Sequence, residues 1–331
     1  MMKTFSTAAA VLGLVVALAA CGSSSKSSST TTTKATTSTP AATPTGPVTG
    51  TPPSASSGPG VGKPPVTIGD KNFTEEFILG SLYAQALAAK GYKVTVKGNI
   101  GSSEIIYKAF QSGQIEMYPE YTGTLLTAVA GVTTPPHSAQ QAYNEAKAFA
   151  EKHGATLLNQ TPFYDSDALG TLKSYATAHH LTTISDLKAL GKSVKLGGAP
   201  EFATRLEGLV GLKQQYGIDP TFVPLAIGLT YKALDTGQVQ VSDVFTTDPQ
   251  LTTGKYTILT DPKKVFGFQN VAPLVKQSVL TAEGPAFAQT INKVSALLTI
   301  PAIQKMNAAV ALDQQPAPQV AREFLSANGL L

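Results

Sequence analysis

The chain has 331 residues, and its 25 Lys and Arg against 21 Asp and Glu give a formal net charge of +4. This small excess, with no run of basic residues between aromatic ones, argues against a nucleic-acid partner. The only cysteine, Cys21, leaves no partner for an internal disulfide, so the core must stabilise any folded body.

The first twenty residues have the pattern of a bacterial lipoprotein signal peptide. Lys3 gives a short basic start, and an apolar run over 8–20 ends in Leu-Ala-Ala directly before Cys21. This arrangement resembles a lipobox, which predicts that residues 1–20 are removed and that Cys21 is lipidated. The alternative is an ordinary signal peptide with a chance cysteine. We expect the mature chain to be lipid-anchored on the extracytoplasmic face of the cell membrane.

Residues 21–65 consist mainly of Ser, Thr, Pro, Gly and Ala, and they contain no aromatic residue. Such a composition buries too little apolar surface to offset the entropy lost on ordering. The sequence therefore predicts a disordered linker over 21–65, between the anchor and a folded body that starts at residue 66.

The body opens with strands and helices in alternation. An alternating apolar run over 66–70 predicts a strand. Leu and Ala at helical spacing then predict a helix that starts with a capping box of Asn72 and Glu75 and stops at Gly91. The next three predicted elements are a strand, a helix and a strand, over 92–99, 102–113 and 114–119. This alternation indicates an α/β class with parallel sheet.

A second series of the same kind follows helices that run to about residue 153. Its predicted elements are strands within 155–172, a helix over 182–191, a strand within 193–202, a helix over 205–217 and a strand over 222–227. The chain closes in helices, over 283–298 and 299–329. No later apolar run is long enough to span a bilayer.

One segment occurs twice. YKAFQSGQIEMYPEYTGT starts at Tyr107 and YKALDTGQVQVSDVFTTD starts at Tyr231, an offset of 231 − 107 = 124 residues. Each copy predicts a helix that ends in glycine and a strand whose far end carries an aromatic residue, Tyr121 or Phe245. Because open α/β sheets bind ligands outside the carboxyl ends of their strands, we expect these two rings on opposite walls of one cleft.

No constellation typical of an enzyme is present. The sequence contains no HExxH, GxSxG, Walker or CxxC motif. We expect the adjacent His179 and His180 on a solvated surface, and the carboxylates of Glu116 and Glu120 are ordinary for helix starts and solvent faces. The sequence thus predicts a protein that is not an enzyme and that requires no cofactor or metal.

The motifs KNFTE and PEYTGT are followed in order by GGAPEFATR, YKALDTG and FGFQN. Over about 66–280 the chain resembles the glycine betaine/carnitine/choline-binding proteins of ABC importers for osmoprotectants. The resemblance implies a two-lobed periplasmic-binding-protein fold of type II, an α/β fold with the ligand cleft between its lobes. Lobe 1 is expected to take 66–164 and 270–331, and lobe 2 to take 165–269.

The resemblance also implies partners. A monomeric solute-binding protein would capture a small quaternary-ammonium osmolyte, close its lobes on it and deliver it to an ABC permease and its ATPase. The other expected contact is with the membrane, through the lipid on Cys21.

Family members hold a trimethylammonium group in an aromatic box and a ligand carboxylate against Lys, Arg and Thr. A quaternary ammonium has no proton to donate, so the negative faces of aromatic rings hold it instead of hydrogen bonds. Matched motif by motif, the residues for the carboxylate are Lys71, Thr124 and Arg205. Tyr121 matches a ring of the box, and Asp165 matches an aspartate at the crossover between the lobes.

Three positions depart from the tyrosines that are common in the family. Phe245 and Phe268 keep a ring without its hydroxyl. Asp167 places a carboxylate where a ring would stand. It either pairs with a cation, which favours choline over a zwitterion, or holds ligand hydroxyls, unless Tyr164 supplies the ring at this place.

Other interpretations stay open at the level of the sequence. The same fold would also suit a polyol or an aromatic compound, and a lipoprotein that binds envelope material without transport is a further alternative. An exported hydrolase would use Glu116 or Glu120. In these cases Lys71 and Arg205 would be surface charges, and Tyr121 would be a core residue.

Overall fold

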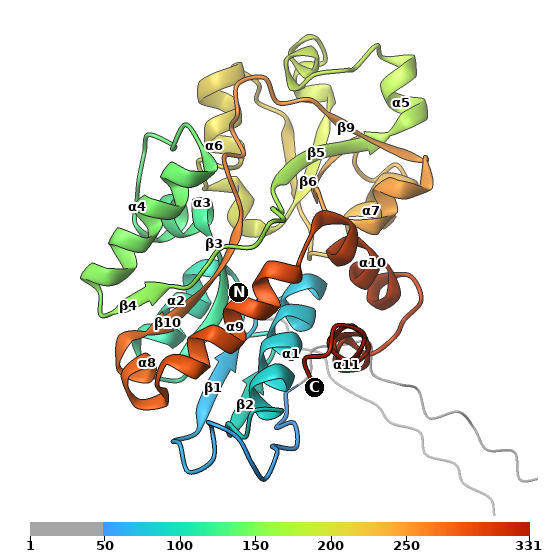
Figure 1. Ribbon diagram of the computed structural model, residues 1–331. Helices are drawn as coiled ribbons and strands as arrows, with labels where there is room; N and C mark the ends of the chain where they lie inside the picture. Colours follow the sequence, from blue (N-terminus) through green and yellow to red (C-terminus); the bar gives the residue numbers. More distant parts are fainter. Residues whose placement is uncertain (1–48) are drawn as a thin grey trace, which may run out of the picture. The chain divides into compact units, whose positions relative to one another are not determined.

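The strands form two five-stranded sheets, which define two lobes (Figure 1). The computed structural model describes residues 49–331. The signal peptide predicted over 1–20 and the predicted lipid attachment at Cys21 lie outside the described residues.

The sheet of lobe 1 has the strand order β2-β1-β3-β10-β4. Its strands are β1 (Val66–Gly69), β2 (Val94–Lys97), β3 (Met117–Tyr121), β4 (Ala155–Leu157) and β10 (Val271–Lys276). The sheet of lobe 2 has the order β7-β6-β8-β5-β9. Its strands are β5 (Asp167–Leu172), β6 (Lys195–Gly198), β7 (Thr221–Pro224), β8 (Val241–Phe245) and β9 (Tyr256–Leu259).

The repeated segment occupies the same place in both sheets. β3 is the central strand of one sheet and β8 is the central strand of the other. Each follows a helix, α2 (Ser103–Gln111) or α7 (Thr230–Asp235), and a glycine with positive φ. These glycines are Gly113, with a φ of 79°, and Gly237, with a φ of 70°. The equivalence that the sequence repeat predicts is therefore confirmed.

Each sheet contains one strand of reversed direction, so the predicted parallel pairing is confirmed for β1, β2 and β3 but does not extend to every strand. β1 is parallel to β2 and β3, whereas β10 is antiparallel to β3 and β4. In the same way β6 is parallel to β7 and β8, and β5 is antiparallel to β8 and β9. β5 and β10 are the strands with which the chain enters one lobe from the other, so they start at the end where the parallel strands finish.

Helices cover both sheets (Figure 1). In lobe 1 they are α1 (Thr74–Ala88), α2, α3 (Thr122–Thr124), α4 (Ala139–Lys152), α8 (Gln277–Glu283), α9 (Pro285–Leu297), α10 (Ile300–Ala311) and α11 (Ala317–Ala327). In lobe 2 they are α5 (Lys173–Ala178), α6 (Leu209–Gly211) and α7, with 3₁₀ turns at Ile184–Ala189, Gly191–Ser193, Pro200–Ala203 and Pro249–Thr253. π-helical turns follow α3 and α6, at Leu125–Val129 and Leu212–Tyr216.

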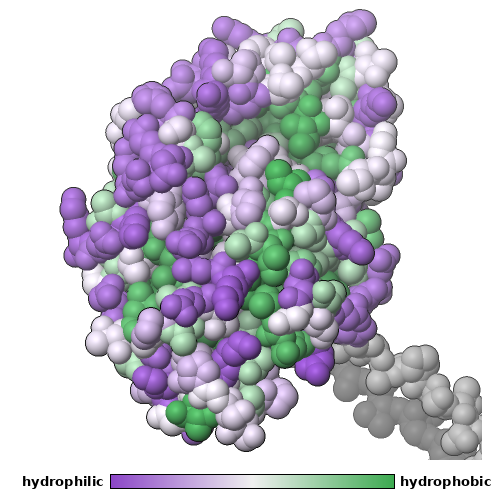
Figure 2. All heavy atoms as spheres, in the orientation of Figure 1, coloured by the Kyte–Doolittle hydropathy of each residue, from purple (hydrophilic) through white to green (hydrophobic). Residues whose placement is uncertain are grey.

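Alternate residues of a strand reach different parts of the core. Val271 and Val275 of β10 belong to the apolar cluster around α1, whereas Ala272 and Leu274 belong to the cluster around α2 and α4. Lobe 2 has two apolar clusters of its own. On the face drawn in Figure 2, hydrophilic residues cover much of the surface and hydrophobic ones are interspersed among them.

Two segments connect the lobes, and they pair with each other. Tyr164 and Asn270 form an isolated antiparallel bridge. The backbone amide of Asp165 donates a hydrogen bond to the carbonyl of Gln269 at 3.1 Å. The crossover therefore fixes the positions of Asp165 and Gln269, which both reach the cavity described below.

Residues 49–65 lie against lobe 1, which corrects the prediction of a disordered linker that extends to residue 65. Gly50 and Val96 of the edge strand β2 exchange two backbone hydrogen bonds, of 3.1 and 2.8 Å. The hydroxyl of Ser54 donates to the carbonyl of Tyr92 at 2.8 Å. An edge strand offers unpaired backbone groups that a segment of almost any composition can bond, so composition alone does not predict disorder here.

Within residues 49–331 no single helix is long and apolar enough to cross a membrane. Taken together, α9 and α10 have the length and apolar composition of a membrane span, but their axes differ by 88° at the break between them.

Candidate ligand-binding site

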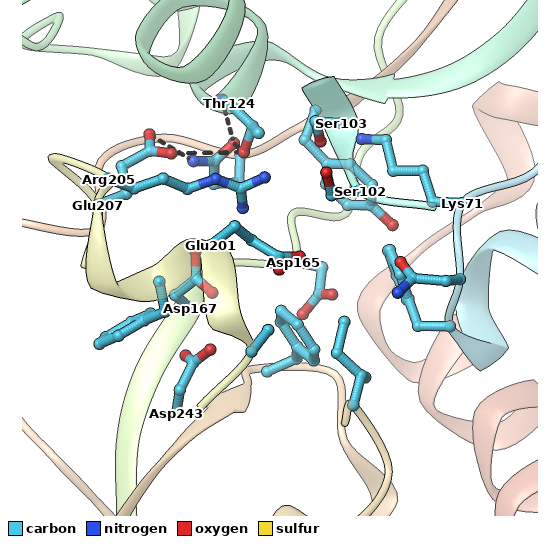
Figure 3. A pocket seen from close by; sticks show the side chains of 18 residues that line it. Lys71, Ser102, Ser103, Thr124, Asp165, Asp167, Glu201, Arg205, Glu207 and Asp243 are labelled. Carbon is cyan, nitrogen blue, oxygen red and sulfur yellow. Dashed lines mark hydrogen bonds between the residues drawn. The ribbon is translucent and has the colours of Figure 1, made fainter. Parts of the chain in front are cut away.

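A cavity is lined by residues of both lobes (Figure 3). Lobe 1 contributes Lys71, Asn72, Phe73, Ser102, Ser103, Tyr121 and Thr124. Lobe 2 and the crossover contribute Asp165, Asp167, Ala199, Glu201, Phe202, Arg205, Glu207, Ile227, Asp243, Phe245 and Gln269. Many of these residues follow the carboxyl ends of strands, which is where open α/β sheets bind ligands.

Three rings form one wall of the cavity. Phe73 stacks on Phe245, with ring centroids 5.5 Å apart and planes inclined by 18°, and its centroid lies 5.9 Å from that of Tyr121. The repeat therefore brings Tyr121 and Phe245 to one cavity, and Phe73 connects them. Phe73 is also the N-cap of α1 with no side-chain hydrogen bond, so the predicted capping box of Asn72 and Glu75 is absent.

Lys71 is buried and already paired. Its ammonium group forms an ion pair with Glu120 and lies 4.5 Å from the ring centroid of Tyr121. The Glu120 carboxylate also accepts hydrogen bonds from the Tyr118 hydroxyl at 2.8 Å and from the backbone amide of Tyr121 at 2.7 Å. With 2% of its surface exposed, Lys71 is not a surface charge, and a carboxylate of lobe 1 neutralises it.

A buried hydrogen-bond network around Glu75 fixes the position of Tyr121 in the aromatic wall. The Glu75 carboxylate accepts hydrogen bonds from the hydroxyls of Tyr121 and Thr247, both at 2.7 Å, and from the amide of Asn307 at 3.0 Å. Burial raises the pKa of Glu75, and these hydrogen bonds act in the opposite direction. The network joins β3, α1 and α10 to the segment after β8, so it couples the two lobes.

Arg205 of lobe 2 forms a bidentate pair with Glu104 of lobe 1. Its Nε and Nη2 donate to the two carboxylate oxygens of Glu104 at 2.9 and 2.8 Å. Partial burial acts to raise the pKa of Glu104, but the hydrogen bonds and charge of Arg205 outweigh it and lower the pKa to about 2. Burial acts to lower the pKa of Arg205, and Glu104 raises it above the ordinary value. The fork expected to hold a ligand carboxylate thus holds Glu104.

Carboxylates outnumber cationic side chains around the cavity. The acidic side chains are Asp165, Asp167, Glu201, Glu207 and Asp243, against Lys71 and Arg205. Figure 3 shows Asp167, Glu201 and Asp243 on the side of the cavity away from Lys71. Because both cationic groups are paired with other carboxylates, the cavity is electrostatically suited to a positive ligand.

Burial raises the pKa of several of these carboxyl groups, so they ionise at a higher pH than usual. Burial and then the charges of Glu75 and Asp248 raise the pKa of Asp165 well above its usual value. Burial also raises the pKa of Asp167 and Asp243, and the two carboxyls are close enough to share a proton. A bound cation would favour the ionised forms of these groups.

Glu207, another acidic residue that lines the cavity, has its own hydrogen-bond partners. Its carboxylate accepts a hydrogen bond from the Gln269 amide at 2.7 Å and one from the Thr124 hydroxyl at 3.4 Å. The backbone amide of Thr124 donates to the side-chain oxygen Oε1 of Gln269 at 3.0 Å. Burial raises the pKa of Glu207 to about 8, and the charge of Asp167 acts in the same direction.

The structure brings together most of the residues that the sequence predicts to contact the ligand. Those that line the cavity are Lys71, Tyr121, Thr124, Asp165, Asp167, Arg205 and Phe245. Their roles toward a ligand stay predictions.

Phe268 is a correction to the predicted site. It lines a different pocket, together with Tyr164, and packs against the apolar cluster around α2 and α4. Gly267, with a φ of 65°, turns the backbone directly before it. Tyr164 is 47% exposed and does not line the cavity, so it does not replace Asp167 as a ring.

Several residues of the site were not predicted from the sequence. Phe73 lies inside the KNFTE motif beside Lys71, and Glu207 follows Arg205 by two positions, so both had a local signal. Glu104 and Asp243 had none, because their importance depends on partners in distant parts of the chain. Within residues 49–331 no group of three or more His, Cys, Asp or Glu side chains is placed to hold a metal ion.

Comparisons with known proteins agree on one family. Residues 64–327 match the OpuAC model, described as the substrate binding domain of an ABC-type glycine betaine transport system. The chain is 33% identical over 276 residues to a glycine-betaine-binding protein of Pseudomonas aeruginosa, covering 80% of this chain and 88% of that protein. It is 28% identical over 277 residues to the glycine betaine-binding protein YehZ of Escherichia coli, covering 80% and 90%.

A solved structure of a glycine betaine/carnitine/choline ABC transporter protein matches with a TM-score of 0.65 and 26% identity, covering 80% of this chain and 99% of that one. The match confirms the type II periplasmic-binding-protein fold that the sequence predicts. The two-lobed fold, the cavity lined by both lobes and the matched length together show that this chain belongs to the OpuAC family, the substrate-binding proteins of ABC-type glycine betaine transport systems.

Proposed function

We propose that this protein captures a quaternary-ammonium cation of the choline type in the cavity between its lobes and delivers it to an ABC permease and its ATPase. The observation that supports this ligand is the wall of Phe73, Tyr121 and Phe245, which faces a set of carboxylates across the same cavity. Aromatic faces and carboxylates together attract a positive group that has no proton to donate.

The internal ion pairs argue against a ligand carboxylate. A zwitterion such as glycine betaine needs a cationic partner, but Glu104 accepts from Nε and Nη2 of Arg205 and Glu120 pairs with Lys71. A ligand carboxylate would either share the remaining N–H groups of Arg205 with a carboxylate already bound there or displace one of these partners, and both are unfavourable. We therefore infer that choline binds more tightly than glycine betaine.

Membrane attachment is part of the same proposal. We infer that Cys21 carries a lipid and becomes the first residue of a monomeric mature protein. Mass spectrometry of the protein extracted from membranes tests this directly. An N-terminus at Cys21 with the mass of acyl chains is expected, and cleavage elsewhere without added mass would contradict it.

Calorimetric titration of the mature protein with choline, carnitine, glycine betaine and proline betaine tests the ligand class. We expect heat of binding from the quaternary-ammonium solutes, with the tightest binding for choline. A polyol of similar size serves as the control and is expected to give none. The absence of heat from all four solutes would reject the proposed function.

Replacing Glu104 tests why the site prefers a cation. Glu104→Gln removes the charge that occupies Arg205, so we expect the affinity for glycine betaine to rise about tenfold relative to that for choline. The matched control is Glu145→Gln, at an exposed position of α4. Unchanged relative affinities in Glu104→Gln would show that this pair does not set the preference.

A further inference from the structure

A second compartment adjoins the aromatic wall. It shares Phe73, Asp165, Asp243 and Phe245 with the cavity already described. Its remaining walls come from the start of α7, the 3₁₀ turn after β8, and α10. The two compartments are therefore neighbours that meet at these shared residues.

Two buried amide oxygens of residues that line this compartment have no hydrogen-bond partner among the described residues. They are Oε1 of Gln250 and Oδ1 of Asn307, which is 4% exposed. The Asp243 carboxyl, 6% exposed, lines the same compartment and has Asp167 as its neighbour. Buried polar atoms are nearly always paired, so the two amide oxygens require a donor.

The free oxygen of Asn307 is fixed by its neighbours. The Asn307 amide nitrogen donates to the carboxylate of Glu75 at 3.0 Å and to the backbone carbonyl of Thr247 at 3.4 Å. Both partners are acceptors, so turning the amide round would place its oxygen against them. The nitrogen therefore stays with Glu75 and Thr247, and the unpaired atom is the acceptor.

The charges of the compartment favour a positively charged donor. Glu75, Asp165, Asp243 and Asp248 line it, and no Lys or Arg within residues 49–331 does. A protonated primary amine has three donors and no acceptor, which suits a wall that offers acceptors and carboxylates. A hydroxyl would also bring lone pairs, for which this wall has fewer partners.

We propose that the second compartment is a subsite for a protonated amine, on a ligand whose quaternary ammonium lies against the aromatic wall. The inference rests on the proposed function and narrows it to dications of the aminoalkyl-trimethylammonium class. Asp243, Gln250 and Asn307 are the residues that recognise the amine. Asp243 also lines the first cavity, so it lies between the two charged ends of the ligand.

Two probes of equal size test this subsite. (3-Aminopropyl)trimethylammonium and butyltrimethylammonium have the same number of non-hydrogen atoms and differ in an ammonium against a methyl group. Titrated into the mature protein at pH 7, the amine is expected to bind roughly tenfold more tightly or better than the butyl compound. Gln250→Leu is expected to reduce this ratio severalfold without changing the affinity for the butyl compound. Asn307→Leu is expected to reduce the ratio as well, and only the ratio is compared for this variant, because Asn307 also donates to Glu75 behind the aromatic wall.

The control variant is Gln140→Leu, at an exposed position of α4 in neither compartment, which is expected to leave the ratio unchanged. Equal affinities of the two probes, while choline still binds, would overturn the subsite and leave the proposed function intact. An amine preference that survives both Gln250→Leu and Asn307→Leu would also overturn it. If choline and both probes fail to bind, the proposed function falls, and the subsite with it.

Discussion

Replacing Phe73 with leucine is expected to weaken choline binding roughly 30-fold, which corresponds to about 2 kcal/mol. Leucine keeps apolar bulk at the N-terminus of α1 but has no negative ring face. Phe73 is the informative ring because it is half-buried, stacks on Phe245 and contacts Tyr121. Calorimetric titration of the variant with choline measures the effect.

Tyr121 is less suitable for this test. Its hydroxyl donates to Glu75, and the ammonium of Lys71 lies over its ring, so its loss would disturb two buried charges as well as the ligand. Tyr107→Leu is the matched control for Phe73→Leu, because Tyr107 is a buried aromatic that packs on Phe110 and does not line the cavity. We expect the control to lower stability without changing affinity. Equal, small losses of affinity in both variants would contradict the role given to Phe73.

Glu207→Gln is expected to stabilise the ligand-free protein at alkaline pH by on the order of 2–4 kcal/mol. Burial raises the pKa of Glu207 to about 8 from its ordinary value of 4.5. Between these values the folded protein retains a proton that the unfolded chain has lost, so the free energy of unfolding falls as the pH rises. Glutamine resembles the protonated form and removes this contribution to the slope.

Urea unfolding at pH 5 and at pH 8.5 measures the change. The variant and the parent protein are expected to differ little at pH 5 and most at pH 8.5. Glu104→Gln is a control that is expected to lower the free energy of unfolding instead of raising it. Arg205 lowers the pKa of Glu104 to about 2, so the ionised form of Glu104 stabilises the fold at neutral pH. A Glu207→Gln variant with the same pH slope as the parent would show that Glu207 is ionised throughout.

The elements that the sequence predicts best are those with local signals. The repeat identifies α2 with β3 and α7 with β8, because hydrophobic period, a terminal glycine and an aromatic strand end all recur. The direction of β5 and β10 is not local information. It follows from where the chain enters each lobe, which only the complete topology reveals.

The ion pairs of the site could not be predicted from the sequence either. Lys71 and Arg205 stand in recognisable motifs, yet the residues that neutralise them are Glu120 and Glu104, 49 and 101 positions away. Phe268 was assigned to the site by the match of FGFQN to the family, and it lines a neighbouring pocket instead. Sequence patterns thus indicate which residue types a site uses, whereas pairing and direction depend on tertiary contacts.

Titration of this cavity with choline and with 3,3-dimethyl-1-butanol separates charge from shape, because the alcohol has the same shape with a neutral carbon in place of the quaternary nitrogen. If rings and carboxylates hold a cation here, choline binds and the alcohol binds at least about 100-fold more weakly. Comparable affinities for the two compounds would show instead that shape and apolar contact alone hold the ligand.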